Sequence, residues 1–454
     1  MKKTALFLWL ALLEGWSPAT ATAQENPRTM DECMQYAVEN SPGVKQAAYA
    51  YDTYKAEYTS SLTAFLPTLT ANSSAQYNFG RAVDPETNTY ANTTTFNNYY
   101  EGYTSLPLFR GGQLVNQWKL AKANRQAGLN DIQKARDDLA LNTMEAFVNA
   151  AYYQGTVRYA AEKLEESNLA LRKMKRQEEL GLKGLSDVAQ IEALVAGDEY
   201  LLTHQRNLFH TALLKLKEYM NYPFERALEV DTATVETGIR LHEGESVGEI
   251  FDRARESAPA ALQAAWKVKA SQLQYLKEKG RLFPSISLSA NVYTSYFENL
   301  KSEATPVAFR NQFRNNRGEN VAVSVSIPLF DGWVRQTDLR RARNNLRIAR
   351  SQQTETLTQL HAAIEQAVAD RNGFAAESIR MQKKLRADEL ACQVTLRKFE
   401  EGLTSPLDVQ TSSNILVESR AGLLQKQLMY LLKCRQVDYY RGEPLIRPQE
   451  LPAE

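Results

Sequence analysis

The chain has few of the residues that build disulfide frameworks, metal centres and catalytic sites. Its 454 residues include three cysteines and four histidines. An odd number of cysteines without metal-ligand or redox spacing argues against a disulfide framework and favours packed, free thiols. The histidines are scattered, and the sequence contains no Ser/His/Asp arrangement, phosphate-binding loop or dinucleotide fingerprint. We therefore expect no metal, no cofactor and no enzymatic activity.

Excess charge and long apolar runs are lacking as well. Lys and Arg together number 54 and Asp and Glu 53, a formal net charge of +1, so no nucleic-acid partner is expected. Beyond the N-terminus no stretch has the roughly 18 continuous apolar residues of a transmembrane helix. At the N-terminus two lysines precede an apolar run over residues 5–13 and small residues at 21–23, which predicts a secretory signal peptide over residues 1–23. An exported chain of this kind is periplasmic, secreted or an outer-membrane barrel.

The most informative feature is a long internal repeat. Ser-Leu-Pro-Leu-Phe-Arg-Gly-Gly at residues 105–112 returns as Ser-Ile-Pro-Leu-Phe-Asp-Gly-Trp at residues 326–333. The dipeptide Gly-Leu at 181–182 returns at 402–403, each time shortly before Asp-Val. Solenoid units are 20–50 residues long, whereas these halves are about 220 residues apart, so we predict a duplicated, pseudo-symmetric chain.

Each half contains a predicted β-hairpin, at residues 67–108 and 284–329. Apolar and small polar residues alternate in these segments, most regularly over residues 321–327. Such strands cover a core in a soluble protein, or they face lipid on one side and an aqueous lumen on the other in an outer-membrane barrel. The long polar loops at 80–98 and 298–318 favour the barrel, because they lie where its surface loops would be.

Each hairpin is followed by a pair of predicted helices. The proline-free stretches 112–180 and 333–400 would each form a helix about 100 Å long. Return helices are predicted at 186–219 and 406–432, after a sharp turn. Apolar positions step by three and four, which predicts closely packed coiled coils. The alternative is an ordinary helical bundle, but helices of this length favour an elongated molecule.

The predicted domain division follows from the repeat. After the signal peptide (1–23), a first repeat occupies residues 24–220 and a second repeat residues 246–435, and each repeat is predicted to begin with a helix that precedes its β-hairpin. An inter-repeat segment at 221–245 separates the two repeats, and a C-terminal tail is predicted at 436–454.

Together these features resemble the TolC family of outer-membrane efflux proteins. The resemblance covers nearly the whole mature chain and rests on the duplication, the Pro-Leu-Phe-x-Gly steps and the Gly-Leu…Asp-Val turns. It implies a mixed α/β membrane protein: a trimeric twelve-stranded β-barrel with four strands per chain, continued by a long α-helical coiled-coil tunnel in the periplasm. Elementary geometry agrees, because open sheet edges are not tolerated in lipid and eight strands leave no water-filled lumen.

The resemblance implies a channel-tunnel in the outer membrane of a Gram-negative bacterium. It would form the exit duct of a tripartite efflux system and conduct substrates passively. The implied partners are two further copies in a homotrimer, a periplasmic adaptor (membrane fusion) protein, an inner-membrane pump of the RND or ABC type, and outer-membrane lipid. Type I protein secretion is an alternative. A periplasmic coiled-coil scaffold or adaptor protein, soluble without detergent, is an alternative of another class.

The resemblance also suggests contact residues at the turns after the long helices. Leu180, Gly181 and Leu182 look like the Val-Gly-Leu tip motif that engages the adaptor. Gly402 and Leu403 are the counterpart in the second half, where Glu401 replaces the apolar first residue. The alternative is that both glycines only end their helices.

Asp408 is the main candidate for the gate of the channel. It matches the first of two acidic residues at the family's entrance constriction, whereas Thr411 stands in the place of the second. Asp187 is its counterpart in the first half, and Ser186 takes the place of a hydroxyl that helps hold the closed state, although Thr404 replaces its basic partner. Three copies of Asp408 would favour cations. The alternative role of both aspartates is to cap helix N-termini, worth about 0.3–1 kcal/mol each.

Overall fold

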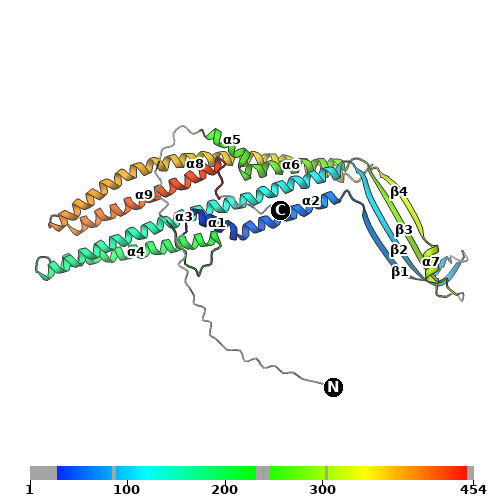
Figure 1. The fold of residues 1–454 in the computed structure, drawn as a ribbon, viewed down its shortest axis with the longest axis horizontal. Helices are drawn as coiled ribbons and strands as arrows, with labels where there is room; N and C mark the ends of the chain where they lie inside the picture. Colours follow the sequence, from blue (N-terminus) through cyan, green and yellow to red (C-terminus); the bar gives the residue numbers. More distant parts are fainter. Residues whose placement is uncertain (1–27, 84–87, 232–238, 240–245, 302–304, 447–454) are drawn as a thin grey trace, which may run out of the picture.

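The computed structural model describes residues 28–83, 88–231, 239, 246–301 and 305–446. The predicted signal peptide lies outside these residues, as do much of the predicted inter-repeat segment and the last residues of the predicted tail. The molecule is elongated, with a sheet at one end and two helical hairpins reaching to the other (Figure 1).

The two halves of the chain repeat one order of elements, apart from the additional helix α7 in the second half. The first half consists of α1 (Met30–Asn40), α2 (Pro42–Thr63), β1 (Thr68–Val83), β2 (Tyr90–Arg110), α3 (Gln113–Glu179) and α4 (Leu185–Met220). The second consists of α5 (Val247–Ser257), α6 (Pro259–Gly280), β3 (Ser285–Asn299), α7 (Phe309–Asn315), β4 (Gly318–Ser326), α8 (Val334–Glu400) and α9 (Pro406–Tyr440). Because α3 and α8 are each 67 residues long, each spans about 100 Å.

Glycine makes the sharp step from strand to long helix possible. Gly111 has φ +58°, and a Cβ atom there would lie 2.1 Å from the carbonyl oxygen of Gly280. Only glycine combines that conformation with such a close approach. In the second half Gly332 has φ +66° and Trp333 has φ +67°, so the same step is made with a non-glycine residue in the left-handed region. The repeated Phe-x-Gly motif therefore encodes the corner between sheet and tunnel.

The four strands form one antiparallel sheet in the order β1-β2-β3-β4. Its register places Ala71 opposite Gly102, and Gly102 opposite Val292. Because side chains alternate along a strand, the apolar positions of all four strands lie on one face. That face has no helical layer over most of its area: Leu69 is 82% exposed and Val321 74%. An apolar face left open in this way belongs against lipid or against another chain.

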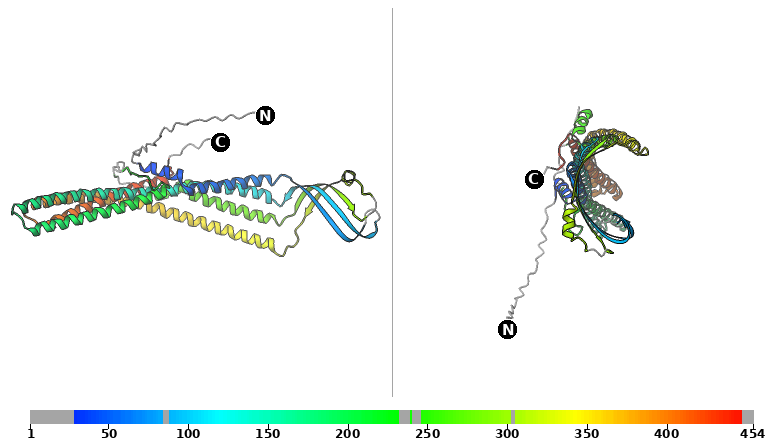
Figure 2. Two further views of the ribbon diagram at one scale, coloured as in Figure 1. Left: turned by 90° about the horizontal axis from the view of Figure 1, so that it is seen from below. Right: turned by 90° about the vertical axis from the view of Figure 1, so that its right-hand side faces the viewer.

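The helices form two hairpins that lie side by side, α3 with α4 and α8 with α9 (Figures 1 and 2). Within the parts of the chain that the structure describes, no helix is both long and apolar enough to cross a bilayer. The largest core lies where α1, α3, α4 and α9 meet midway along the molecule. Its fully buried side chains include Met34, Met144, Leu216, Met220 and Leu428.

The three cysteines are free thiols, as the odd count predicted. Cys33 and Cys392 are buried and Cys434 is partly buried. Burial raises the pKa of the Cys33 thiol to about 12, because its anion would lose hydration in the apolar core. These cysteines therefore act as small core residues.

Most predicted element bounds hold to within two residues, and the larger differences are the following. Helix α9 continues to Tyr440, past the predicted end at 432 and into the predicted tail, because Val437 and Tyr440 pack in a second core with α5 and α8. Strand β4 ends at Ser326, before the predicted hairpin end at 329. The loop between β3 and β4 contains the helix α7, which the sequence pattern did not predict.

Candidate functional site

The predicted tip residues lie at the turns that end the two helical hairpins (Figure 1). Gly181 has φ +71° and Gly402 has φ +76°. In the first turn the Leu182 amide donates to the Gln177 carbonyl at 2.9 Å, and in the second the Leu403 amide makes the matching bond at 2.8 Å. This is the glycine-dependent closure that satisfies the last carbonyls of a helix. Both glycines therefore end their helices, as one reading of the sequence predicted.

The leucines beside these glycines are presented to the outside. Leu180 is 59% exposed, and Leu182 and Leu403 are each 70% exposed. Two leucines in the first turns of the return helices, Leu185 and Leu407, are similarly exposed and were missed by the sequence analysis. In the sequence they could have been recognised as apolar residues one or two positions after the N-cap residues Gly184 and Ser405. Exposed leucines gathered at the end of an otherwise polar hairpin form an apolar contact surface.

Both predicted gate aspartates cap the return helices. The Asp408 carboxylate accepts hydrogen bonds from the Thr404 hydroxyl at 2.6 Å, the Ser405 hydroxyl at 2.8 Å and the Ser405 amide at 3.1 Å. Because these donors stabilise the anion, with Thr404 the largest contributor, they hold the pKa of Asp408 below its usual value. Asp187 accepts from the Gly184 amide at 3.2 Å, and Ser186 is exposed.

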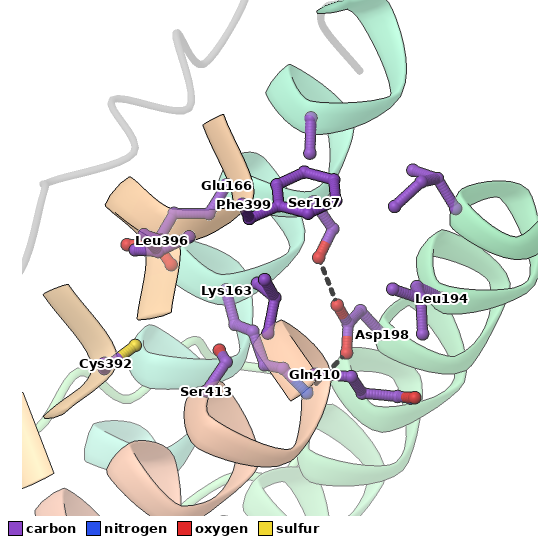
Figure 3. Close-up of a pocket in the computed structure, with 13 residues that line it drawn as sticks. Lys163, Glu166, Ser167, Leu194, Asp198, Cys392, Leu396, Phe399, Gln410 and Ser413 are labelled. Carbon is purple, nitrogen blue, oxygen red and sulfur yellow. Dashed lines mark hydrogen bonds and ion pairs between the residues drawn. The ribbon is translucent and has the colours of Figure 1, made fainter. Parts of the chain in front are cut away.

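A buried ion pair between α3 and α4, about 25 Å along the helix from the first tip, was missed by the sequence analysis (Figure 3). Lys163 Nζ on α3 lies 2.7 Å from Asp198 Oδ1 on α4, with the side chains only 6% and 5% exposed. The Ser167 hydroxyl donates to the other Asp198 oxygen at 2.5 Å, and Lys163 also donates to Asn414 on α9. Lys163 lies in the apolar stripe of α3 that includes Ala160. A charged residue in such a stripe is the sequence feature that could have indicated a buried ion pair.

The ion pair borders a small cavity between the two hairpins (Figure 3). The cavity holds about 70 Å³, far below the roughly 300 Å³ of small-molecule sites, and its lining is mainly apolar. Burial raises the pKa of Glu166 and of the Cys392 thiol at its wall. We interpret the cavity as a packing gap between hairpins and not as a binding site. Among the described residues no group of three or more His, Cys, Asp and Glu could hold a metal ion.

The apolar sheet face is bounded by two belts of aromatic side chains. One belt, at the corner with the helices, contains Phe109, Phe283, Phe330 and Trp333, all exposed. The other lies towards the loops and contains Tyr77, Phe79, Phe96, Tyr296, Phe309 and Phe313. Strand β3 rises about 33 Å from Ile286 to Tyr296. At a tilt of about 40° this is about 25 Å along the membrane normal, the height of the apolar band in transmembrane barrels.

Helix α7 completes the sheet edge near the second belt. The Gln312 side chain accepts from the Phe297 amide at 3.0 Å and donates to its carbonyl at 2.9 Å. The Thr294 hydroxyl donates to the Phe313 carbonyl at 2.6 Å. Strand β4 is short and does not pair with the outer part of β3. Side chains of α7 and its flanking residues replace the missing backbone hydrogen bonds there, because an edge without partners would be costly in lipid.

Comparisons with known proteins agree with this geometry. The sequence model of the Outer membrane efflux protein family matches residues 33–221 and 250–437, one segment in each half. Outer membrane protein TolC of Escherichia coli (strain K12) is 21% identical over 437 residues, which cover 92% of this chain and 84% of TolC.

Solved structures give the same fold. The Campylobacter jejuni CmeC outer membrane channel superposes with a TM-score of 0.78 at 14% identity, over 91% of this chain and 85% of CmeC. The outer membrane protein VceC of Vibrio cholerae gives a TM-score of 0.75 at 16% identity, over 90% of this chain and 95% of VceC. The predicted fold of each chain, a four-stranded sheet continued by long paired helices in two tandem repeats, is confirmed. The chain belongs to the outer membrane efflux protein family and is an outer-membrane channel protein of a Gram-negative bacterium, not an enzyme.

Proposed function

We propose that three copies of this chain form the exit duct of a tripartite efflux system. The duct conducts substrates passively from a periplasmic adaptor and an inner-membrane pump to the exterior. One observation carries the proposal: a sheet with an open apolar face and two open edges continues directly into helices about 100 Å long. Such helices have the length needed to cross much of the periplasm.

The open edges support closure by further copies. Strands β1 and β4 are the edges of the sheet, and their free backbone groups require partners in lipid. Pairing β4 of one subunit with β1 of the next satisfies both edges. Three copies give twelve strands, the smallest closed ring of such four-stranded units with room for water inside. The outward apolar face between the aromatic belts then contacts outer-membrane lipid.

The hairpin tips support contact with an adaptor protein. Leu180, Leu182 and Leu403 are exposed at the far end of the helices and lie outside the small core of Met174, Val188 and Ile191. We assign the first tip, Leu180-Gly181-Leu182, as the stronger contact, because Glu401 replaces the apolar residue at the second. An adaptor with complementary apolar positions would cover these leucines.

Asp408, with Asp187 and Ser186, is proposed to line the entrance of the duct. The Asp408 carboxylate is exposed and its pKa is lowered by hydrogen bonds from Thr404 and Ser405, so it is ionised at neutral pH. Three such carboxylates around one axis would attract cations. Capping and gating are compatible, because the capping bonds hold the carboxylate in place.

Export from cells tests the proposal. A strain that lacks this chain should accumulate a fluorescent efflux substrate, and the wild-type gene should restore export, with the protein in the outer-membrane fraction and dependent on detergent for extraction. If the same strain instead fails to secrete a protein cargo while drug accumulation stays normal, type I secretion replaces drug efflux. A chain that is soluble without detergent would contradict both and favour the scaffold alternative.

A further inference from the structure

The two helical hairpins are related position by position. Helices α3 and α8 begin at Gln113 and Val334 and end at Glu179 and Glu400, so neither contains an insertion relative to the other. The return helices α4 and α9 begin at counterpart positions as well. Each residue of the first hairpin therefore has one counterpart in the second.

Counterpart positions make counterpart contacts. In the first hairpin the Thr156 hydroxyl on α3 donates to Gln205 Oε1 on α4 at 2.8 Å. The counterparts of these residues are Glu377 on α8 and Lys426 on α9, which form an ion pair at 2.7 Å. The side chains have changed, but the same two positions face each other in both hairpins. The repeat can therefore be used to transfer a contact from one half to the other.

The order of the helices shows which contact an isolated chain lacks. Helix α3 packs against both α4 and α9, and α9 packs against α8, so the order across the subunit is α4, α3, α9, α8 (Figures 1 and 2). In a closed ring of copies, α8 lies beside α4 of the next subunit. The repeat relates α3 to α8 and α9 to α4. Each contact between α3 and α9 inside one subunit therefore has a counterpart between α8 and the neighbour's α4.

The contact between α3 and α9 contains an ion pair. Arg420 Nη1 on α9 lies 3.3 Å from Glu162 Oε2 on α3. The counterpart of Glu162 is Lys383 on α8, and the counterpart of Arg420 is Glu199 on α4. Lys383 and Glu199 are exposed, and neither forms an ion pair with another described residue. Lys383 and Glu199 carry opposite charges, as Glu162 and Arg420 do. The signs are exchanged, however, because a base stands in the place of Glu162 and an acid in the place of Arg420.

Packing beside this ion pair is matched in size. A Cβ atom on Gly155 of α3 would lie 2.2 Å from Cδ2 of Leu424 on α9, so the leucine fills the space that glycine leaves. The counterparts are Ala376 on α8 and Thr203 on α4. Ala376 has one methyl group more than Gly155, and Thr203 is smaller than Leu424. The two changes compensate, as expected of side chains that meet across an interface.

We propose that Lys383 of one subunit and Glu199 of its neighbour form an ion pair in the assembled duct, with Thr203 packed on Ala376 beside it. This inference rests on the proposed assembly and names the residues that join its subunits in the tunnel wall. The partner is a second copy of this chain, and the contact repeats at all three subunit boundaries.

The reversal of sign gives the interface its specificity. If α4 of one subunit met α3 of another, Glu199 would face Glu162. If α9 met a second subunit's α8, Arg420 would face Lys383. Both wrong arrangements bring like charges together, and only the alternating order of hairpins pairs every acid with a base.

Charge reversal in the full-length protein tests the ion pair. The trimer is heated in detergent at the temperature where half of the wild-type trimer dissociates. Lys383→Glu should lower the fraction of trimer that survives this treatment about tenfold, because three pairs become repulsive at once. Glu199→Lys should do the same, and the double variant should recover most of the loss, since the pair is restored with its charges exchanged. Lys175→Glu is the matched control: Lys175 pairs with Glu192 inside one hairpin, so its reversal should leave the trimer unchanged.

Disulfide trapping tests the geometry independently of stability. In a background with Cys33, Cys392 and Cys434 replaced by alanine, Glu199→Cys with Lys383→Cys should give covalent dimers and trimers on oxidation. Glu192→Cys with Lys383→Cys, displaced along α4 by about two turns, should give almost none.

The outcomes separate this inference from the proposed function. Trimers that conduct ions but show no rescue in the double variant and no trapping would overturn the inference and leave the function standing. A wild-type protein that is never trimeric would overturn both. Equal trapping by the control pair would mean that the helices meet in another register, which also contradicts the assignment.

Discussion

The two coiled-coil hairpins carry the same three side-chain types at counterpart positions, but they use them differently. A lysine, an aspartate and a serine interact in each hairpin: Lys163, Asp198 and Ser167 in the first, and Lys384, Asp388 and Ser419 in the second. The lysines occupy counterpart positions, whereas the aspartate and the serine have exchanged places between the two helices.

This exchange changes what each hairpin can do. In the first, the ion pair of Lys163 and Asp198 crosses from α3 to α4 and is almost fully buried, and Lys163 also binds Asn414 of α9. In the second, Lys384 and Asp388 lie on the same helix with side chains 51% and 18% exposed, and only Ser419 joins them to α9. The first hairpin is therefore cross-linked at this level by a buried ion pair, whereas the ion pairs that join α8 to α9, such as Lys426 with Glu377 and Lys433 with Asp370, are partly exposed.

Removing the buried acid should have the largest effect on this comparison. Asp198→Ala leaves the Lys163 ammonium buried without its partner and should lower the free energy of unfolding by about 3–5 kcal/mol. Asp388→Ala, the matched change in the second hairpin, should cost at most about 1 kcal/mol, because the Lys384 side chain is 51% exposed and stays hydrated without its partner. Chemical denaturation in detergent measures both. Equal losses would contradict the difference between the hairpins.

Crowding the tip glycines should have an intermediate effect. Gly181→Leu and Gly402→Leu each force a side chain into the left-handed region, at a cost of about 1–2 kcal/mol to the turn. No other atom lies within 4 Å of the added Cβ in either turn, so assembly should survive. Export from cells should fall more for Gly181→Leu, because the first tip has leucines on both sides of its glycine. An equal effect of the two variants on export would remove the asymmetry between the tips.

Neutralising the capping aspartate should have the smallest effect on the fold and a measurable one on selectivity. Asp408→Asn should shift the reversal potential of the purified channel towards zero under a salt gradient, whereas Asp187→Asn should shift it less. Because hydrogen bonds lower the pKa of Asp408, its charge and its capping contribution are present at neutral pH and are lost only as pH falls through that lowered pKa, below the usual value near 4. Wild-type cation selectivity should therefore stay constant from about pH 7 to pH 5. An unchanged reversal potential in the variant would exclude Asp408 from the gate.

Much of the architecture followed from the sequence, because its determinants are local. Period-two alternation located the strands, proline-free heptads located the long helices, and Gly181 and Gly402 marked the turns. Helix α7 could not be predicted, since its role is to supply Gln312 to an edge of β3 that only the folded sheet creates. The position of Lys163 in an apolar stripe could have indicated a buried charge, but its partner Asp198 could be identified only once both helices were placed together.

The roles of the site residues were only partly accessible from the sequence. The capping bonds of Asp408 follow from the Ser-Pro-Leu-Asp order, and the structure contains them. Gating and adaptor contact depend on surfaces that form between chains, so one sequence could suggest them only through resemblance. The proposed pairing of Lys383 with Glu199 could be argued only once the structure placed α3 between α4 and α9.

The current carried by the purified protein in a planar lipid bilayer tests the central claim most directly. The account predicts stable, water-filled pores that appear in single steps, formed by a particle with the mass of three chains. A detergent-free monomer that never inserts and passes no current would contradict it.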